Sequence, residues 1–183
     1  MAELFKNIYW ADIGQACLET LSMLAAARGF TVLLGLPLGV LLFLTGKRQL
    51  HEALVVYRLL SVVVNVLRSL PFIILLIVLI PVTTLLTGTA LGVRGVIPPL
   101  VVGTTAFFAR LVETALREVD RGLIEAGQSM GASTWQIVWF TLLPEARLGL
   151  ISAVTVTAIV LVDYTAMSGA IGGGGIGDLA IRY

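Results

Sequence analysis

The most informative chemical group in this chain is a carboxylate, Asp163, that lies inside an apolar segment. On membrane-insertion scales a carboxylate at the centre of a spanning helix costs roughly 2.5–3.5 kcal/mol unless it is paired or hydrated. Arg28 lies within another apolar run and is the natural partner. We expect an ion pair between the two, because pairing lowers the free-energy cost of placing each charge in the membrane. The alternative is that Asp163 faces a hydrated path.

Other groups that could carry chemistry are scarce. Gly172, Gly174 and Gly177 fit the pattern G-x-G-x-x-G, but no strand is expected before them and no helix with a downstream acidic partner after them. We therefore predict a tight or mobile loop and no dinucleotide site. The single histidine, His51, and the single cysteine, Cys17, leave no set for a metal site or for nucleophilic catalysis. No phosphate-binding loop of the Walker A type occurs, so we predict no enzyme and no cofactor.

The composition is that of a membrane protein. Hydrophobic residues make up 58% of the 183 residues, charged residues 13%, and the mean hydropathy is +1.00. Soluble domains are nearer a quarter charged. The net charge of +1 gives no basic field for nucleic acid. We therefore predict an all-α protein that crosses the membrane several times.

The elements that must position these groups follow from the apolar runs. A helix that crosses the hydrocarbon core of a membrane needs about 20 apolar residues. We place such spans at 18–44, 68–86, 96–116 and 145–169. We read 1–16 as a polar and aromatic lead-in, 53–67 as an amphipathic entry in the membrane interface, and 170–177 as a glycine-rich exit loop. No repeat or linker divides the chain, so we expect one domain over 1–183.

One polar stretch interrupts this pattern, and we call residues 120–144 the corner segment. Asp120 can cap a helix start, and Gly131 suits a left-handed turn at a helix end. Ser133 and Gln136 stand at capping-box spacing, so a second short helix should begin at Ser133. Pro144 should end it, because proline lacks an N–H group and clashes with the preceding turn. The prediction is helix, tight corner, helix.

The corner segment resembles a loop of the membrane permease subunits of ABC importers. Their motif reads E-A-A, three residues, G, nine residues, I, one residue, L-P. Glu125, Ala126, Gly131 and Leu143-Pro144 match it. Two positions depart from it, because Gly127 replaces an alanine and Thr141 replaces the isoleucine. Neither departure removes the corner or the caps.

The resemblance implies a type I importer permease fold in the inner membrane, with about four spans here where the family usually has five. It implies two copies around a translocation path, a cytoplasmic ATP-hydrolysing subunit and an extracytoplasmic substrate-binding protein. The corner segment would face the cytoplasm and dock on the ATPase. The excess of Lys and Arg in the 45–52 loop and around the corner segment favours the same orientation. We assign this coupling role to Glu125, Ala126, Gly131, Ala132, Leu143 and Pro144.

Two further stretches resemble the methionine branch of that family. Arg68-Ser69-Leu70-Pro71-Phe72 matches the start of a span, and Tyr164, Met167 and Ser168 match a stretch in the last one. We expect these three residues, with Asp163 and Arg28, to line the pathway or to pack inside the membrane. In the pathway, Asp163 would meet the ammonium group of an amino-acid substrate. The alternatives are a permease for another small solute, such as a polar amino acid or a phosphonate, or a membrane scaffold protein.

Overall fold

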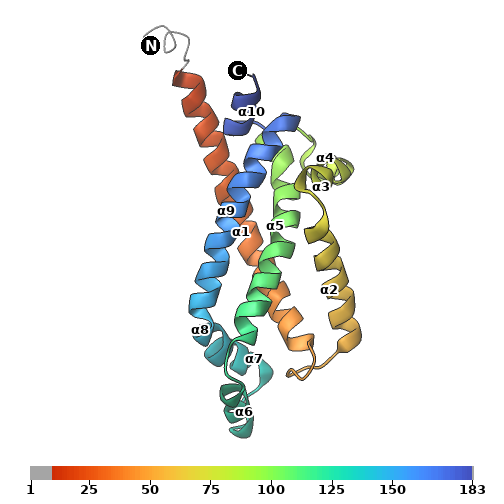
Figure 1. The fold of residues 1–183 in the computed structure, drawn as a ribbon, viewed down its shortest axis with the longest axis vertical. Helices are drawn as coiled ribbons and strands as arrows, with labels where there is room; N and C mark the ends of the chain where they lie inside the picture. The colour runs from red at the N-terminus through yellow and green to blue at the C-terminus, as the bar shows by residue number, and fades with distance from the viewer. Residues whose placement is uncertain (1–9, 183) are drawn as a thin grey trace. The chain divides into compact units, whose positions relative to one another are not determined.

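The computed structural model describes residues 10–182, which contain helices and no strand (Figure 1). This confirms the all-α expectation. Residues 1–9 of the lead-in predicted over 1–16 lie outside the described residues. The elements are α1 (Trp10–Thr45), α2 (Leu54–Ser69), α3 (Phe72–Val78), α4 (Ile80–Thr87), α5 (Gly92–Arg117), α6 (Arg121–Ser129), α7 (Thr134–Ile137), the π-helix η1 (Val138–Leu142), α8 (Leu143–Glu145), α9 (Arg147–Ser168), the 3-10 helix η2 (Gly169–Ile171) and α10 (Gly175–Arg182).

Three helical segments are long and apolar enough to cross a membrane: α1, α5, and α9 with η2. A fourth span is counted if α2 and α3 form one broken span. The prediction of a continuous span over 68–86 is wrong, because the helix stops at Ser69 and restarts at Phe72. Leu70 takes an extended conformation before Pro71, since a proline disfavours the helical conformation of the residue that precedes it.

The described residues form two compact units, and the division falls within α1, α5 and α9. Unit 1 holds the described residues up to Gly29, Pro71–Val101, and those from Val160 onward. Unit 2 holds Phe30–Leu70 and Val102–Ile159, and so contains the whole corner segment. The single-domain reading stays a prediction.

In unit 2, α1 packs closely on α5 at a glycine. A Cβ atom on Gly39 would lie 2.6 Å from Cβ of Val112 and 2.7 Å from the carbonyl oxygen of Ala109, so only hydrogen fits there. Nearby, the buried hydroxyls of Thr31 and Thr104 lie 2.6 Å apart and bond across the two helices. The core of this unit joins the long helices to the corner segment through Phe43, Phe108, Val112, Leu116, Ile124, Ile137, Val138 and Leu142.

In unit 1, the rings of Phe72 on α3 and Tyr164 on α9 stack with centroids 4.2 Å apart. The glycine-rich loop predicted over 170–177 is shorter than expected, because α10 already begins at Gly175. Its first N–H groups lack partners within the helix. Side chains of α1 supply the missing acceptors: Glu19 accepts a hydrogen bond from Gly175 N at 2.8 Å, and Thr20 accepts one from Ile176 N at 2.9 Å.

Candidate functional site

The first half of the corner segment forms as its sequence predicts. Asp120 caps α6, and its carboxylate accepts a hydrogen bond from Gly122 N at 2.8 Å. At the other end Gly131 has φ of +78°, the left-handed region that favours glycine. Its N–H donates to the carbonyl of Gln128 at 2.9 Å, and Ala132 N donates to that of Gly127 at 3.0 Å. This pair of bonds is a Schellman motif.

The second half begins as predicted and ends later than predicted. The hydroxyl of Ser133 accepts from Gln136 N, and the side chain of Gln136 accepts from Ser133 N at 2.8 Å, which forms a capping box. Pro144 does not end the helical path, which continues to Glu145. The turn ahead of Pro144 widens into the π-helix η1, in which Leu143 N donates to the carbonyl of Val138. Most π-helical segments are single-turn bulges of this kind inside α-helical paths.

The corner segment has one buried face and one exposed apolar face. Ile124, Ile137 and Leu142 are buried in the core of unit 2. On the other side, Met130 is 82% exposed and Phe140 is 79% exposed. Both line a surface hollow of about 390 Å³ beside Gly131. Exposed apolar patches rimmed by polar groups mark interaction sites, so this face is suited to bind a partner.

The motif residues take different places in this arrangement. Glu125, Ala126 and Pro144 are exposed, while Ala132 and Leu143 pack partly against the core. In the part of the chain that the structure describes, the Glu125 carboxylate forms no hydrogen bond or ion pair. It lines a small hollow with the 46–52 loop, and its coupling role stays a prediction.

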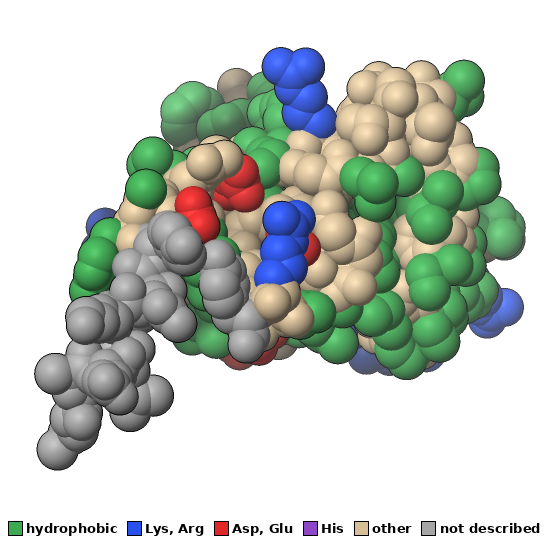
Figure 2. All heavy atoms as spheres, turned by 90° about the horizontal axis from the view of Figure 1, so that it is seen from above, with side chains coloured by type: hydrophobic (Ala, Val, Ile, Leu, Met, Phe, Trp, Pro, Cys, Tyr) green, Lys and Arg blue, Asp and Glu red, His purple; other side chains and the backbone are tan. Residues whose placement is uncertain are grey.

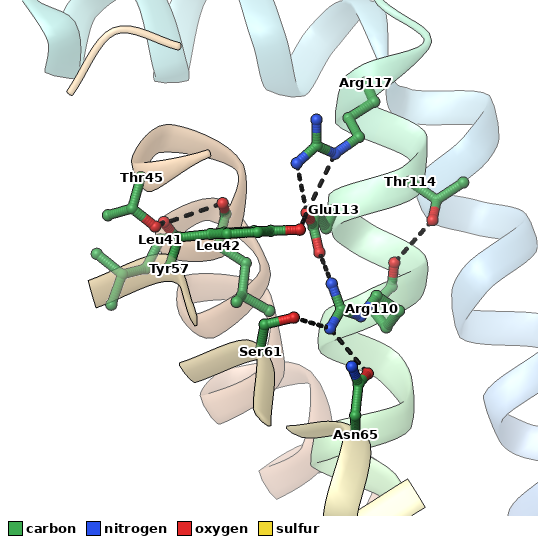
Figure 3. Close-up of polar contacts among 10 residues, drawn as sticks. All are labelled: Leu41, Leu42, Thr45, Tyr57, Ser61, Asn65, Arg110, Glu113, Thr114 and Arg117. Atoms are coloured by element: carbon green, nitrogen blue, oxygen red, sulfur yellow. Dashed lines mark hydrogen bonds and ion pairs between the residues drawn. The ribbon is translucent and has the colours of Figure 1, made fainter. Parts of the chain in front are cut away.

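A polar network surrounds the buried carboxylate of Glu113 in unit 2, near the end of α5 that leads into the corner segment, and we call it the Glu113 network (Figure 3). Glu113 of α5 is 2% exposed, yet its carboxylate pairs with two cations, Arg110 at 2.5 Å and Arg117 at 2.7 Å. Tyr57 of α2 donates to the same carboxylate at 3.2 Å. Arg110 also donates to Ser61 at 2.6 Å and to Asn65 at 2.9 Å.

The sequence predicts only part of this network. The i, i+3 pair of Arg110 and Glu113 is expected on one face of a helix and is confirmed. The partners on α2 were missed. Tyr57, Ser61 and Asn65 stand four residues apart, so a polar stripe along one face of an otherwise apolar helix was a signal that could have found them.

The predicted ion pair between Arg28 and Asp163 is wrong as a direct contact. The ion pairs seen within the described residues, Arg110–Glu113, Arg117–Glu113 and Arg182–Asp178 among them, do not join Arg28 to Asp163. Arg28 and Asp163 are both exposed on the chain. The two charges therefore do not neutralise each other, and both side chains lie on the surface of the chain.

The three residues that follow Asp163 in the predicted set differ from one another. Tyr164 is half-buried against Phe72. Met167 is exposed and lies four residues after Asp163, so the two share one face of α9. Ser168 is fully buried, and its hydroxyl donates to the carbonyl of Thr165 at 2.7 Å. That is the arrangement of a packing residue and argues against a place in a pathway.

Comparison with known proteins decides the family. The sequence model of the family described as "Binding-protein-dependent transport system inner membrane component" matches residues 23–182. The chain belongs to this family. It is a multi-pass component of a transport system of the inner membrane.

Named relatives place the chain more closely within the family. It is 49% identical over 174 residues to the "Probable D-methionine transport system permease protein MetI" of Pasteurella multocida, covering 95% of this chain and 80% of the relative. It is 48% identical over 176 residues to the "Methionine import system permease protein MetP" of Bacillus subtilis, covering 96% and 79%. A solved structure of the "MetNI methionine ABC transporter" in inward-facing conformations superposes with a TM-score of 0.93 at 46% identity, covering 97% and 82%.

In this inner membrane component, polar side chains gather at the end of unit 1 that contains α10. Figure 2 shows acidic and basic side chains gathered on that face, with hydrophobic side chains around its edge. A hollow of about 740 Å³ opens there, lined by α1, the start of α5 and α10. The glycines beside it are tightly turned, as expected, with positive φ at Gly172, Gly174 and Gly175.

Proposed function

We propose that this chain is the permease subunit of an ATP-driven importer that takes up methionine across the inner membrane. The observation that carries the proposal is the exposed apolar face of Met130 and Phe140 beside the motif glycine Gly131. The chain that presents it is 46% identical to a solved methionine ABC transporter. The names of the relatives support the substrate. The chain is expected to hydrolyse no ATP itself, since no phosphate-binding loop occurs in its sequence.

The corner segment would couple the chain to its ATPase. Met130 and Phe140 offer apolar side chains on the exposed face, and phenylalanine and methionine are enriched at the cores of protein interfaces. The Schellman motif and the capping box fix the angle between α6 and α7. A movement of the ATPase would therefore reach the membrane helices as a displacement of one rigid element rather than being absorbed in a flexible loop.

Two copies of the chain would enclose the translocation path. Asp163 and Met167 lie on one exposed face of α9, and a charge within a spanning helix is tolerated when it faces water, a partner or a bundle interior rather than lipid. We assign this face to the path or to the second copy. Within the path, the carboxylate of Asp163 would meet the ammonium group of methionine. Lipid would surround the remaining apolar surface.

The orientation of the chain follows from this assignment. The corner segment would lie in the cytoplasm with its ATPase. An extracytoplasmic substrate-binding protein would deliver methionine from the opposite side of the membrane. Glu125, Ala126, Ala132, Leu143 and Pro144 would act with Gly131 at the ATPase contact.

The test is uptake by the reconstituted system. The chain is assembled with its ATPase in proteoliposomes, the binding protein is supplied outside, and uptake of radiolabelled L- and D-methionine is measured with and without ATP inside. We expect ATP-dependent accumulation that unlabelled methionine competes away. Preferential uptake of a polar amino acid or a phosphonate would reassign the substrate. A stable ATPase complex without any uptake would indicate a scaffold.

A further inference from the structure

The short loop between α1 and α2, residues 46–52, is firmly held to the end of α1. Its backbone returns to that helix through His51 N, which donates to the carbonyl of Leu44 at 3.2 Å, and through Ala53 N, which donates to that of Thr45 at 3.2 Å. Arg48 adopts φ of +60°, and its N–H donates to the carboxylate of Glu52 at 3.0 Å. The loop is therefore a defined structure rather than a slack connection.

The same loop reaches the corner segment. Nε2 of His51 lies 3.0 Å from the hydroxyl of Thr134, the first residue of α7, although the two residues are 83 positions apart. Leu50 packs against the core cluster that contains Ile124 of α6 and Ile137 of α7. The loop and α6 also line a common hollow of about 140 Å³. One hydrogen bond thus joins the loop to α7, and Leu50 packs against the core cluster to which both helices of the corner segment contribute.

This contact gives the corner segment a second attachment. Along the chain, α6 follows α5 and α8 leads into α9, so covalent connection carries a displacement to those two helices. The 46–52 loop adds a route to the end of α1 and the start of α2. Thr134 follows the capping residue Ser133 directly, so the bond from His51 fixes the point where the corner turns into α7.

We propose that His51 and Leu50 are positioning residues of the coupling machinery, which hold α6 and α7 in place relative to α1 and α2. The inference rests on the proposed coupling function of the corner segment. It adds residues outside the family motif, and it gives a role to the single histidine of the chain.

The experiment compares His51→Ala, Thr134→Val and the double variant in the complex of the chain with its ATPase in nanodiscs and proteoliposomes. Lys47→Ala is the matched control, because Lys47 is an exposed residue of the same loop. Two quantities are measured: the hydrogen-exchange rate of the amides of residues 134–138, and the methionine taken up per ATP hydrolysed. The exchange rate reports on how firmly α7 is held, and the uptake per ATP reports on coupling.

We expect each single variant to raise the exchange rate about five-fold, the factor expected for one lost hydrogen bond. The double variant should add little, because both changes remove the same contact. Uptake per ATP should fall by a factor of about three or more, with assembly of the complex unchanged. His51→Gln, which keeps a hydrogen-bonding side chain, should recover part of both losses, and Lys47→Ala should match the unchanged protein.

If the amides of residues 134–138 exchange at the same rate in His51→Ala as in Lys47→Ala, the contact between His51 and α7 is overturned. If they exchange faster in His51→Ala but the methionine taken up per ATP is unchanged, the role of the contact in coupling is overturned. Failure of the proposed function is separate, since it would appear as absent methionine uptake in the unchanged protein. In that case the exchange comparison alone decides whether His51 positions α7.

Discussion

The hydroxyl of Tyr57 donates a hydrogen bond to the carboxylate of Glu113 at 3.2 Å and so joins α2 to α5 (Figure 3). The same carboxylate holds Arg110 and Arg117. One buried anion therefore neutralises part of two cationic charges inside a largely apolar unit. The stability of unit 2 should depend on that anion more than on any other polar group in the network.

Replacing Glu113 by Gln should strongly destabilise the protein. The substitution keeps the size of the side chain and leaves two arginines without their counter-ion, and breaking a buried ion pair costs about 3–5 kcal/mol. Thermal unfolding of the purified protein in nanodiscs measures the effect. Tyr57→Phe is the control, because it removes one hydrogen bond, worth about 1.5–3 kcal/mol to a charged acceptor, and keeps both ion pairs. Equal melting temperatures for the two variants would show that the charges are solvated.

Replacing Gly131 by Asp should impair coupling without preventing membrane insertion. The new carboxylate would lie beside the exposed apolar face of Met130 and Phe140, where an unpaired charge opposes burial against a partner. Methionine uptake and ATPase binding are measured at equal amounts of inserted protein. Gly131→Asn is the matched control, because asparagine tolerates the left-handed conformation about as well as aspartate. We expect the Asp variant to lose at least about ten-fold more uptake; undiminished uptake would contradict the docking role.

Replacing Ser133 by Ala should loosen the start of α7. The capping box satisfies backbone groups at the helix start, and removing such a cap costs about 1 kcal/mol. Hydrogen exchange of residues 134–138 should accelerate roughly five-fold. Ser129→Ala is the control, since the Ser129 hydroxyl bonds within α6 to the carbonyl of Glu125 and caps nothing. Similar exchange in both variants would mean that packing alone holds α7.

Replacing Gly177 by Ala should displace α10 from the end of α9. A Cβ atom at this position would overlap the backbone of Ala166, and overpacking of this kind costs about 1–3 kcal/mol. Exchange of the amides of residues 175–182 should rise about ten-fold or more. Gly14→Ala is the control in the same unit, because a Cβ atom there meets open space and alanine favours a helix. Unchanged exchange in α10 would show that the backbone shifts to admit the methyl group.

The corner segment was the most predictable part of the molecule. Asp120 as a cap, Gly131 as the left-handed residue and the capping box of Ser133 with Gln136 are all found as predicted. Each of these features joins residues at most a few positions apart, so the local sequence contains both partners. The prediction for Pro144 was wrong because a π-helical turn accommodates the proline, and nothing in the neighbouring residues specifies that turn.

The sequence by itself determined the membrane class, the approximate spans and the local caps, because hydropathy and capping depend on neighbours along the chain. Only the tertiary structure decided which distant groups meet. Glu19 caps α10 from 156 positions away, His51 reaches Thr134, and Glu113 collects partners from α2. The same packing left Arg28 and Asp163 exposed and unpaired with each other. Such contacts depend on how whole helices lie against one another, and in apolar spans many arrangements bury similar surfaces, so the pattern of residues does not select among them.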